Sequence, residues 1–190
     1  MLAPSLSADT TEIPQWAHEK KPVKMSYNLG VGTSYPLDNI ADYWKQGFHG
    51  YGRLNFLLSP KLNVWAGADF HFFPFDDEAD TSVRGANLST LNFTGDLKIN
   101  LGMPLSGVNP YLFGGTGVAV PNISDSSKYF YVGETLDSIH TVTYPRKAYA
   151  LIEIGGGVEY KYFFIQGCYL TIMFNRKSQS YIPITVGVKF

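Results

Sequence analysis

Apolar residues fall on every second position along much of the chain. Between residues 90 and 101, apolar or small residues occupy the odd positions and polar residues occupy the even ones. A period of two is the pattern of a β-strand with two different faces. The last ten residues, YIPITVGVKF, repeat this pattern and end on Phe190. The sequence therefore predicts strands that are apolar on one face and polar on the other.

Turn residues divide the chain, after a polar lead-in, into eight such runs. The segments between the runs lack a helical period, which disfavours a parallel α/β fold. Their lengths alternate between short and long, which is typical of an up-and-down meander. Runs of about ten residues or more are long enough to cross a bilayer at a tilt. The runs cover 23–35, 44–58, 62–74, 88–101, 110–120, 147–160, 162–174 and 181–190.

The period alone does not decide which face of a barrel lies inside. In a soluble lipocalin-like or avidin-like barrel the apolar face forms the core, whereas in a membrane barrel it contacts lipid. The polar face here carries few charges and many Gly, Ser, Thr and Asn residues, unlike a water-exposed surface. We therefore predict a closed eight-stranded antiparallel up-and-down transmembrane β-barrel. Aromatic residues near the run ends are predicted to lie at two membrane interfaces: Tyr35, Phe48, Phe56, Phe72, Tyr111, Tyr160, Phe174, Tyr181 and Phe190.

The composition argues against several other classes of protein. The chain has 15 Lys and Arg against 16 Asp and Glu, so its charge gives no reason to expect nucleic acid as a partner. Its single cysteine, Cys168, excludes an internal disulfide framework. No stretch reaches the ~18 apolar residues that a membrane helix needs.

Residues 1–22 precede the first run, and the barrel domain is predicted to span 23–190. The first residues have no charged segment followed by an apolar core, so they do not form an intact secretory signal. We expect residues 1–22 to be a periplasmic leader or the remnant of a signal. A plug that enters the barrel and a docking segment are the alternatives.

The ending and the strand pattern together resemble a known family. A final alternating strand that ends in Phe190 resembles the C-terminal signal that the outer-membrane assembly machinery of bacteria reads. The phrases NPYLFGGTGVAV and GGGVEYKY resemble strands of the small eight-stranded outer-membrane barrels, the group of the OmpA transmembrane domain and OmpX. The resemblance implies a bacterial outer-membrane location, periplasmic termini, and contact with the lipid bilayer and lipopolysaccharide. It specifies no activity, because the group includes anchors, adhesins, pores, lipid-modifying enzymes and subunits of larger machines.

Eight charged residues fall on the polar face and would lie in the lumen of a closed barrel. Four are basic and four are acidic, and we expect them to pair, because an unpaired buried charge is costly. A selective ion pore would show an excess of one sign, and eight strands enclose little more than their own side chains. A mostly plugged lumen is therefore predicted, with a charge network of Lys24, Arg53, Asp69, Asp96, Lys98, Glu153, Glu159 and Lys189.

The hairpin that turns at Pro60 is predicted to bring two histidines together. The residue numbers of two opposed positions in this hairpin add up to 120. His49 is therefore paired with His71, and Asp69 lies two residues along. Opposed Cβ atoms lie about 5 Å apart, and two His residues with a carboxylate are a plausible metal-ligand set. The alternative is a pair of hydrogen-bonded lumen histidines, and no cofactor is predicted.

The predicted function is structural or interactive, as in anchoring or adhesion, rather than catalytic. Barrel lipid hydrolases carry a His-x-Ser pair, and the histidines here read AHEK, FHGY, FHFF and IHTV. An accessory subunit of a larger envelope or secretion complex, with protein partners, is one alternative. A narrow channel for small or hydrophobic solutes is another. The faces of runs 110–120 and 162–174 stay unassigned, because Tyr111 or Leu112 would fit inside and YFFIQGCYLTIMF alternates poorly.

Overall fold

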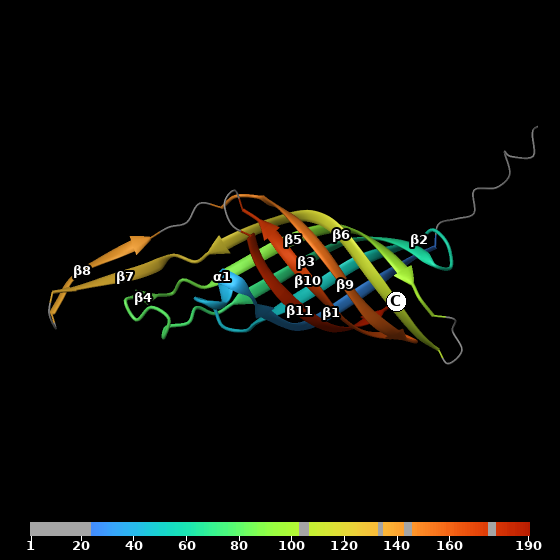
Figure 1. Ribbon diagram of the computed structural model, residues 1–190, viewed down its shortest axis with the longest axis horizontal. Coiled ribbons are helices and arrows are strands. Elements are labelled where there is room, and N and C mark those ends of the chain that lie inside the picture. The colour runs from blue at the N-terminus through green and yellow to red at the C-terminus, as the bar shows by residue number, and fades with distance from the viewer. Residues whose placement is uncertain (1–23, 103–106, 133–134, 143–145, 175–177) are drawn as a thin grey trace, which may run out of the picture.

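A computed structural model describes residues 24–102, 107–132, 135–142, 146–174 and 178–190. Within these residues, eight strands form a closed antiparallel barrel in the order β1-β11-β10-β9-β6-β5-β3-β2 (Figure 1). Successive wall strands are neighbours, which confirms the predicted up-and-down architecture. The wall strands are β1 (Lys24–Pro36), β2 (Gly47–Leu57), β3 (Leu62–Phe73), β5 (Leu88–Asn100), β6 (Val108–Ile123), β9 (Tyr149–Tyr160), β10 (Phe163–Met173) and β11 (Ser178–Lys189).

The last strand closes the barrel against the first. The register of β1 and β11 runs from Asn28 opposite Lys189 to Pro36 opposite Tyr181. Beyond it, Tyr27 and Phe190 exchange two backbone hydrogen bonds of 3.0 and 2.8 Å. The alternating C-terminal segment is therefore held on both sides, by β1 and by β10, and the wall has no open edge.

The two ends of the barrel differ. The turn end carries the connections β2–β3, β5–β6 and β9–β10, together with the start of β1 and the C-terminus (Figure 1). The loop end carries the short helix α1 (Asp38–Ala41) and a three-stranded sheet in the order β4-β7-β8. The strands of this sheet are β4 (Val83–Arg84), β7 (Ser126–Val132) and β8 (Thr135–Val142). The β7–β8 hairpin projects beyond the wall along the long axis of the molecule (Figure 1).

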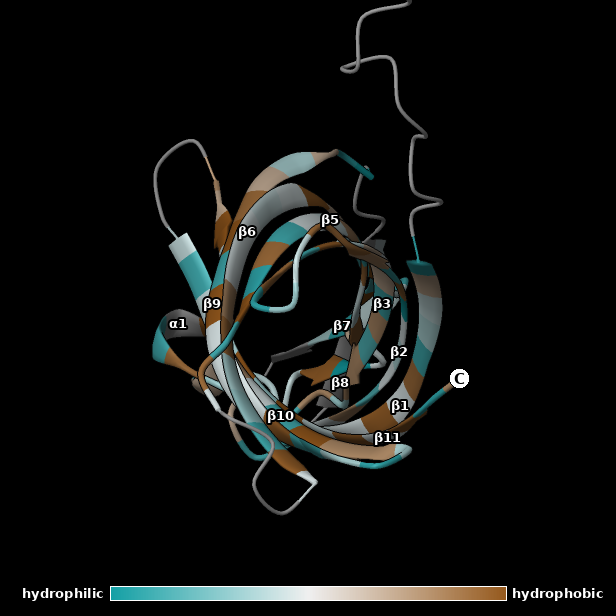
Figure 2. Cartoon of the chain, turned by 90° about the vertical axis from the view of Figure 1, so that its right-hand side faces the viewer, coloured by the Kyte–Doolittle hydropathy of each residue, from teal (hydrophilic) through white to brown (hydrophobic). Residues whose placement is uncertain are grey.

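Burial alternates along the wall strands in the sense expected for a membrane barrel. On β5, Asn92 and Lys98 are buried in the lumen, whereas Phe93 and Leu97 are 52% and 55% exposed on the outer face. Figure 2 shows the same alternation of apolar and polar positions around the wall. An apolar outer face around a polar interior is the distribution of a transmembrane β-barrel. Among the described residues, no helix is long and apolar enough to cross a membrane.

The structure assigns the faces of the two ambiguous runs. On β6, Tyr111 points into the lumen and Leu112 is exposed on the wall. On β10, Leu170 and Ile172 are buried inside, while the odd-numbered neighbours face outward. β10 alternates poorly in sequence because part of the lumen that it faces is itself apolar.

Candidate functional site

Arg53 of β2 lies in the lumen among carboxylates from three other strands. Its Nη1 is 2.8 Å from Asp96 Oδ2 of β5, and its Nη2 is 2.5 Å from Glu153 Oε1 of β9. Asp69 of β3 is more distant, with Oδ2 3.9 Å from Nη2. All four side chains are almost fully buried. One guanidinium therefore offsets much of the cost of burying three carboxyl groups.

Aromatic rings surround the same guanidinium. Its central carbon lies 4.8 Å from the ring centroid of Tyr51, 5.1 Å from that of Trp65 and 5.2 Å from that of Phe113. Cation–π contacts are strongest where water is excluded, and these three contacts lie in the buried lumen. Gly67 makes room for the side chain, because a Cβ atom there would lie 2.4 Å from Arg53 Cγ. Packing and charge together fix the position of Arg53.

A second charged group lies nearer the turn end. Lys98 Nζ donates a hydrogen bond to Glu159 Oε1, and Lys189 Nζ lies 3.1 Å from Glu159 Oε2. Lys98 Nζ also lies 4.1 Å from the ring centroid of Tyr111. The structure thus brings seven of the eight predicted lumen charges into two groups.

Lys24 does not join either group, which corrects the predicted network. It is the first residue of β1, its side chain is exposed, and it makes no ion pair with another described residue. A charge at the rim of the barrel is solvated by water, so it gains little from a buried partner.

His49 and His71 lie opposite each other on β2 and β3, with ring centroids 5.0 Å apart. Ser34 of β1 binds both rings, because its Oγ lies 3.0 Å from His49 Nδ1 and 2.8 Å from His71 Nδ1. His49 Nε2 is 2.9 Å from Thr185 Oγ1. Asp69, the third ligand of the metal hypothesis, contacts Arg53 instead. Within the described ranges, no group of three His, Cys, Asp or Glu side chains could hold a metal ion.

Ser34 is a functional candidate that the sequence reasoning missed. A hydroxyl beside two imidazoles has the make-up of a nucleophile with a general base. However, Ser34 is 0% exposed, and both histidines are buried with it. The available signal was the place of Ser34 on the polar face of the first run, opposite Gly47 of β2. The arrangement orders the two imidazoles by hydrogen bonding and offers no access to a substrate.

The loop-end part of the lumen is closed by apolar side chains rather than by charges. Ile40 of α1 inserts into this cluster, and Trp44, which follows the helix, packs against it. The sequence pattern gave no sign of the cluster, because its buried members come from seven separate elements. Its buried members are Ile40, Phe73, Leu88, Ala119, Leu151, Leu170, Ile172 and Tyr181.

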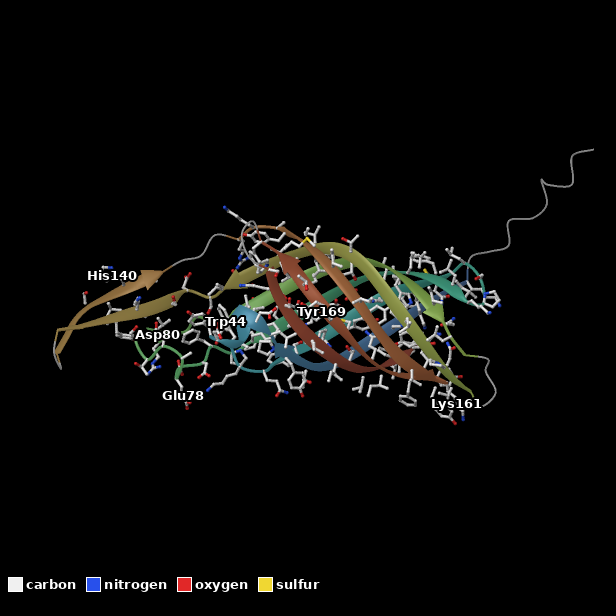
Figure 3. The ribbon with its side chains drawn as sticks, in the orientation of Figure 1. Trp44, Glu78, Asp80, His140, Lys161 and Tyr169 are labelled. Atoms are coloured by element: carbon white, nitrogen blue, oxygen red, sulfur yellow. The ribbon has the colours of Figure 1, made fainter. Side chains whose placement is uncertain are left out.

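The connections at the loop end are tied to one another. Trp44 Nε1 donates a hydrogen bond of 2.7 Å to the Ala86 carbonyl, and the Trp44 ring meets Phe75 edge-on. Lys45 pairs with Asp76 at 3.1 Å, which raises the pKa of the lysine; the Glu78 backbone N–H and Lys45 lower the pKa of Asp76. Figure 3 shows Trp44, Glu78 and Asp80 together at this end, far from Lys161.

The predicted interface aromatics divide between the wall and the lumen. Tyr35, Phe48, Tyr160 and Phe190 are exposed on the outer face, and Phe56 and Phe72 lie on the same face with partial exposure. Three predictions are wrong: Tyr111 and Tyr181 are buried in the lumen, and Phe174 packs against the apolar cluster. Tyr111 donates a hydrogen bond of 2.9 Å from its hydroxyl to Gln166 Oε1, and Tyr181 accepts one of 2.8 Å from Asn92, so their polar hydroxyls find partners inside.

The closed wall, apolar outside and polar inside, defines a small transmembrane barrel with the fold of bacterial outer-membrane proteins. The chain is similar to Ail, the attachment invasion locus protein of Yersinia pestis, with a TM-score of 0.54 and 12% identity over 87% of this chain and 97% of that one. It is also similar to Neisserial surface protein A, with a TM-score of 0.52 and 11% identity over 87% of this chain and 95% of that one. No protein-family model matches the chain, and no curated protein matches it by sequence.

Proposed function

We propose that the protein is an integral barrel of the bacterial outer membrane that presents a contact surface and catalyses no reaction. The carrying observation is the contrast between a lumen filled with paired and apolar side chains and a sheet that projects from the loop end. In this orientation the loop end faces outward, lipopolysaccharide surrounds the wall at that end, and both termini lie in the periplasm. The strand that ends in Phe190 is then available to the assembly machinery.

The projecting sheet is the part best suited to contact another protein. Within the described residues, β8 pairs with β7 on one side only, so its other edge presents backbone N–H and C=O groups. An extended segment of a partner can pair with such an edge. Ile139 on β8 is 54% exposed and adds an apolar contact beside that edge. The name of Ail, an attachment protein, supports the same kind of role.

The buried side chains along the lumen support an anchor over the channel alternative. The apolar cluster occupies the loop-end part, the histidines and Ser34 follow, and the Arg53 and Lys98 groups occupy the rest. Each layer is made of buried side chains that contact one another. Opening a path for solutes would separate these ion pairs and expose the apolar cluster to water, which is unfavourable.

An accessory subunit of a larger complex is the second candidate, and one feature of the wall favours it. A groove of about 410 Å³ on the outer face is lined by Tyr27, Leu29, Gly52, Leu54 and Ala68 among others. The small residues of this groove leave space on the lipid-facing wall that another transmembrane segment would fill.

Photo-crosslinking in native outer membranes separates these candidates. A crosslinking residue is placed at Ile139 on the projecting sheet, at Leu54 beside the groove, or at Ile154 on the opposite wall as the control. We expect protein adducts from Ile139 and lipid adducts alone from Leu54 and Ile154. Protein adducts from Leu54 alone would instead establish the subunit role, and lipid adducts alone from all three would refute a contact surface.

Planar-bilayer recordings test the plugged lumen separately. We expect the purified protein to insert without conductance steps at neutral pH. Discrete steps that disappear when the protein is omitted would replace the anchor with the channel.

A further inference from the structure

A cavity of about 240 Å³ opens at the loop end of the barrel. Leu88 and Ile123 lie opposite each other on β5 and β6, and Tyr149 lies opposite the buried Ala119. These are lumen-facing positions, so the cavity opens into the barrel mouth rather than through the lipid-facing wall. Its lining is Leu88, Pro121, Ile123, Lys147, Tyr149, Phe174 and Gln179.

The cavity is blind. Leu88 belongs both to its lining and to the buried apolar cluster, and Ile123, Tyr149 and Phe174 pack against that cluster. Tyr149 and Phe174 form one wall with ring centroids 4.2 Å apart. A molecule that enters from the loop end therefore meets an apolar floor and does not pass through the barrel.

The rim of the cavity is positively charged. Lys147 is exposed and makes no ion pair with another described residue. No Asp or Glu belongs to the lining. An apolar pocket with the cation Lys147 at its rim, unpaired with any described carboxylate, is complementary to a molecule with an apolar body and an anionic head.

We propose that this cavity binds a single-chain anionic amphiphile, with its hydrocarbon tail on the apolar floor and its carboxylate or phosphate at Lys147. A volume below the roughly 300–1,000 Å³ of drug-sized pockets fits one short chain and excludes a whole membrane lipid. Because the mouth opens along the barrel axis, the ligand arrives free from water. The site goes beyond the contact role and does not depend on the projecting sheet.

Octanoate is the probe, and octanol is its neutral counterpart. The full chain is placed in nanodiscs of zwitterionic lipid, and the side-chain methyl resonances of Ile123, in the cavity, and Ile99, exposed on the wall, are followed by NMR during titration. We expect saturable shifts at Ile123 and only weak, linear shifts at Ile99 from partitioning into lipid. Octanoate should bind about fivefold more tightly than octanol, as one exposed ion pair allows.

Variants assign the effect to the cavity. Lys147→Gln should remove the preference for octanoate, whereas Lys61→Gln, an exposed lysine at the turn end, should leave it intact. Gln179→Trp should block binding of both probes by filling the cavity. Parallel shifts at Ile99 and Ile123, equal affinity for octanol in the unaltered protein, or an unchanged preference in Lys147→Gln would each overturn the proposal. Saturation of Ile123 by nanodiscs that contain anionic lipid and no octanoate would transfer the site to a membrane lipid, against the proposal.

Discussion

The guanidinium of Arg53 contacts carboxylates from three strands and the faces of three aromatic rings. A buried ion pair is weak evidence for stability in itself, because desolvation costs about as much as the attraction returns. Removal of one member is different, since the remaining charges stay buried without a partner. The stability of the barrel therefore depends on Arg53 more than on any single carboxylate of this group.

Replacement of Arg53 by methionine tests this dependence at the scale of one residue. We expect Arg53→Met to lower the free energy of unfolding by about 3–5 kcal/mol, because it leaves three carboxyl groups uncompensated. Urea unfolding of the refolded barrel in lipid vesicles, followed by tryptophan fluorescence, measures the change.

Two further variants check the cause of that loss. Lys45→Met removes an exposed ion pair at the loop end and should leave the unfolding curve unchanged. Adding Asp96→Asn and Glu153→Gln to Arg53→Met should recover part of the lost stability, because two of the three buried carboxyl groups are then replaced by neutral amides and only Asp69 remains. A loss that persists in full in the triple variant would point to the aromatic packing around Arg53 instead.

At the scale of strands, two glycines of neighbouring wall strands differ in the space that a side chain would find. A Cβ atom at Gly95, on the outer face of β5, would have no heavy atom within 4 Å. A Cβ atom at Gly115, which faces the lumen on β6 opposite Asp96, would lie 2.2 Å from both the Gly95 carbonyl oxygen and Asp96 Oδ1. Gly95 could therefore be replaced by a larger residue without a clash. Gly115 is required, because β5 and β6 approach too closely there for a side chain.

The matched substitutions to alanine should therefore differ in sign. We expect Gly115→Ala to destabilise the barrel by about 1–3 kcal/mol through overpacking. Gly95→Ala should be neutral or stabilise it by up to about 1 kcal/mol, because alanine restricts the unfolded chain. Equal losses in the same urea assay would contradict the placement of Gly95 on the open face.

The strands were predictable from sequence wherever the lumen is polar. β5 alternates cleanly because charged and amide groups face inward while aliphatic groups face outward. β10 could not be assigned, since Leu170 and Ile172 fill an apolar part of the lumen and both faces of the strand read alike. The same cause misplaced Tyr181, whose aromatic ring suggested a membrane interface although its hydroxyl is satisfied inside.

The candidate site was predictable only to the extent that strand register determines which residues share a face or lie opposite each other. Parity places Arg53, Asp69, Asp96 and Glu153 in one lumen, and the sum of 120 pairs His49 with His71. Register across the β2–β3 hairpin does not show which residue of the neighbouring strand β1 hydrogen-bonds to both rings. Ser34 was missed for this reason, and Ile40 was missed because α1 is one turn long and has no pattern to detect.

At the scale of the whole molecule, the enclosure of the buried lumen side chains depends on closure of the wall by β1 and β11. These strands are the first and the last wall strands in the sequence, and their pairing closes the wall. Leu29 lies opposite Val188 in this register. This pair is two residues along from Tyr27 and Phe190, which exchange both backbone hydrogen bonds, so it is a hydrogen-bonded pair as well. Opposed residues of this kind have Cα atoms about 5.5 Å apart, within the range of a disulfide.

Cysteines at Leu29 and Val188 should therefore form a disulfide across the closing seam, in a Cys168→Ala background that removes the native thiol. Oxidation of the inserted protein, followed by non-reducing gel electrophoresis in its unfolded form, measures the crosslinked fraction. The control pair places cysteines at Leu29 and Ile184, four residues out of register and about 13 Å apart along the strand. We expect near-complete crosslinking of the first pair and little of the second, whereas equal yields would mean that β11 slides along β1 and that the wall is not closed in a single register.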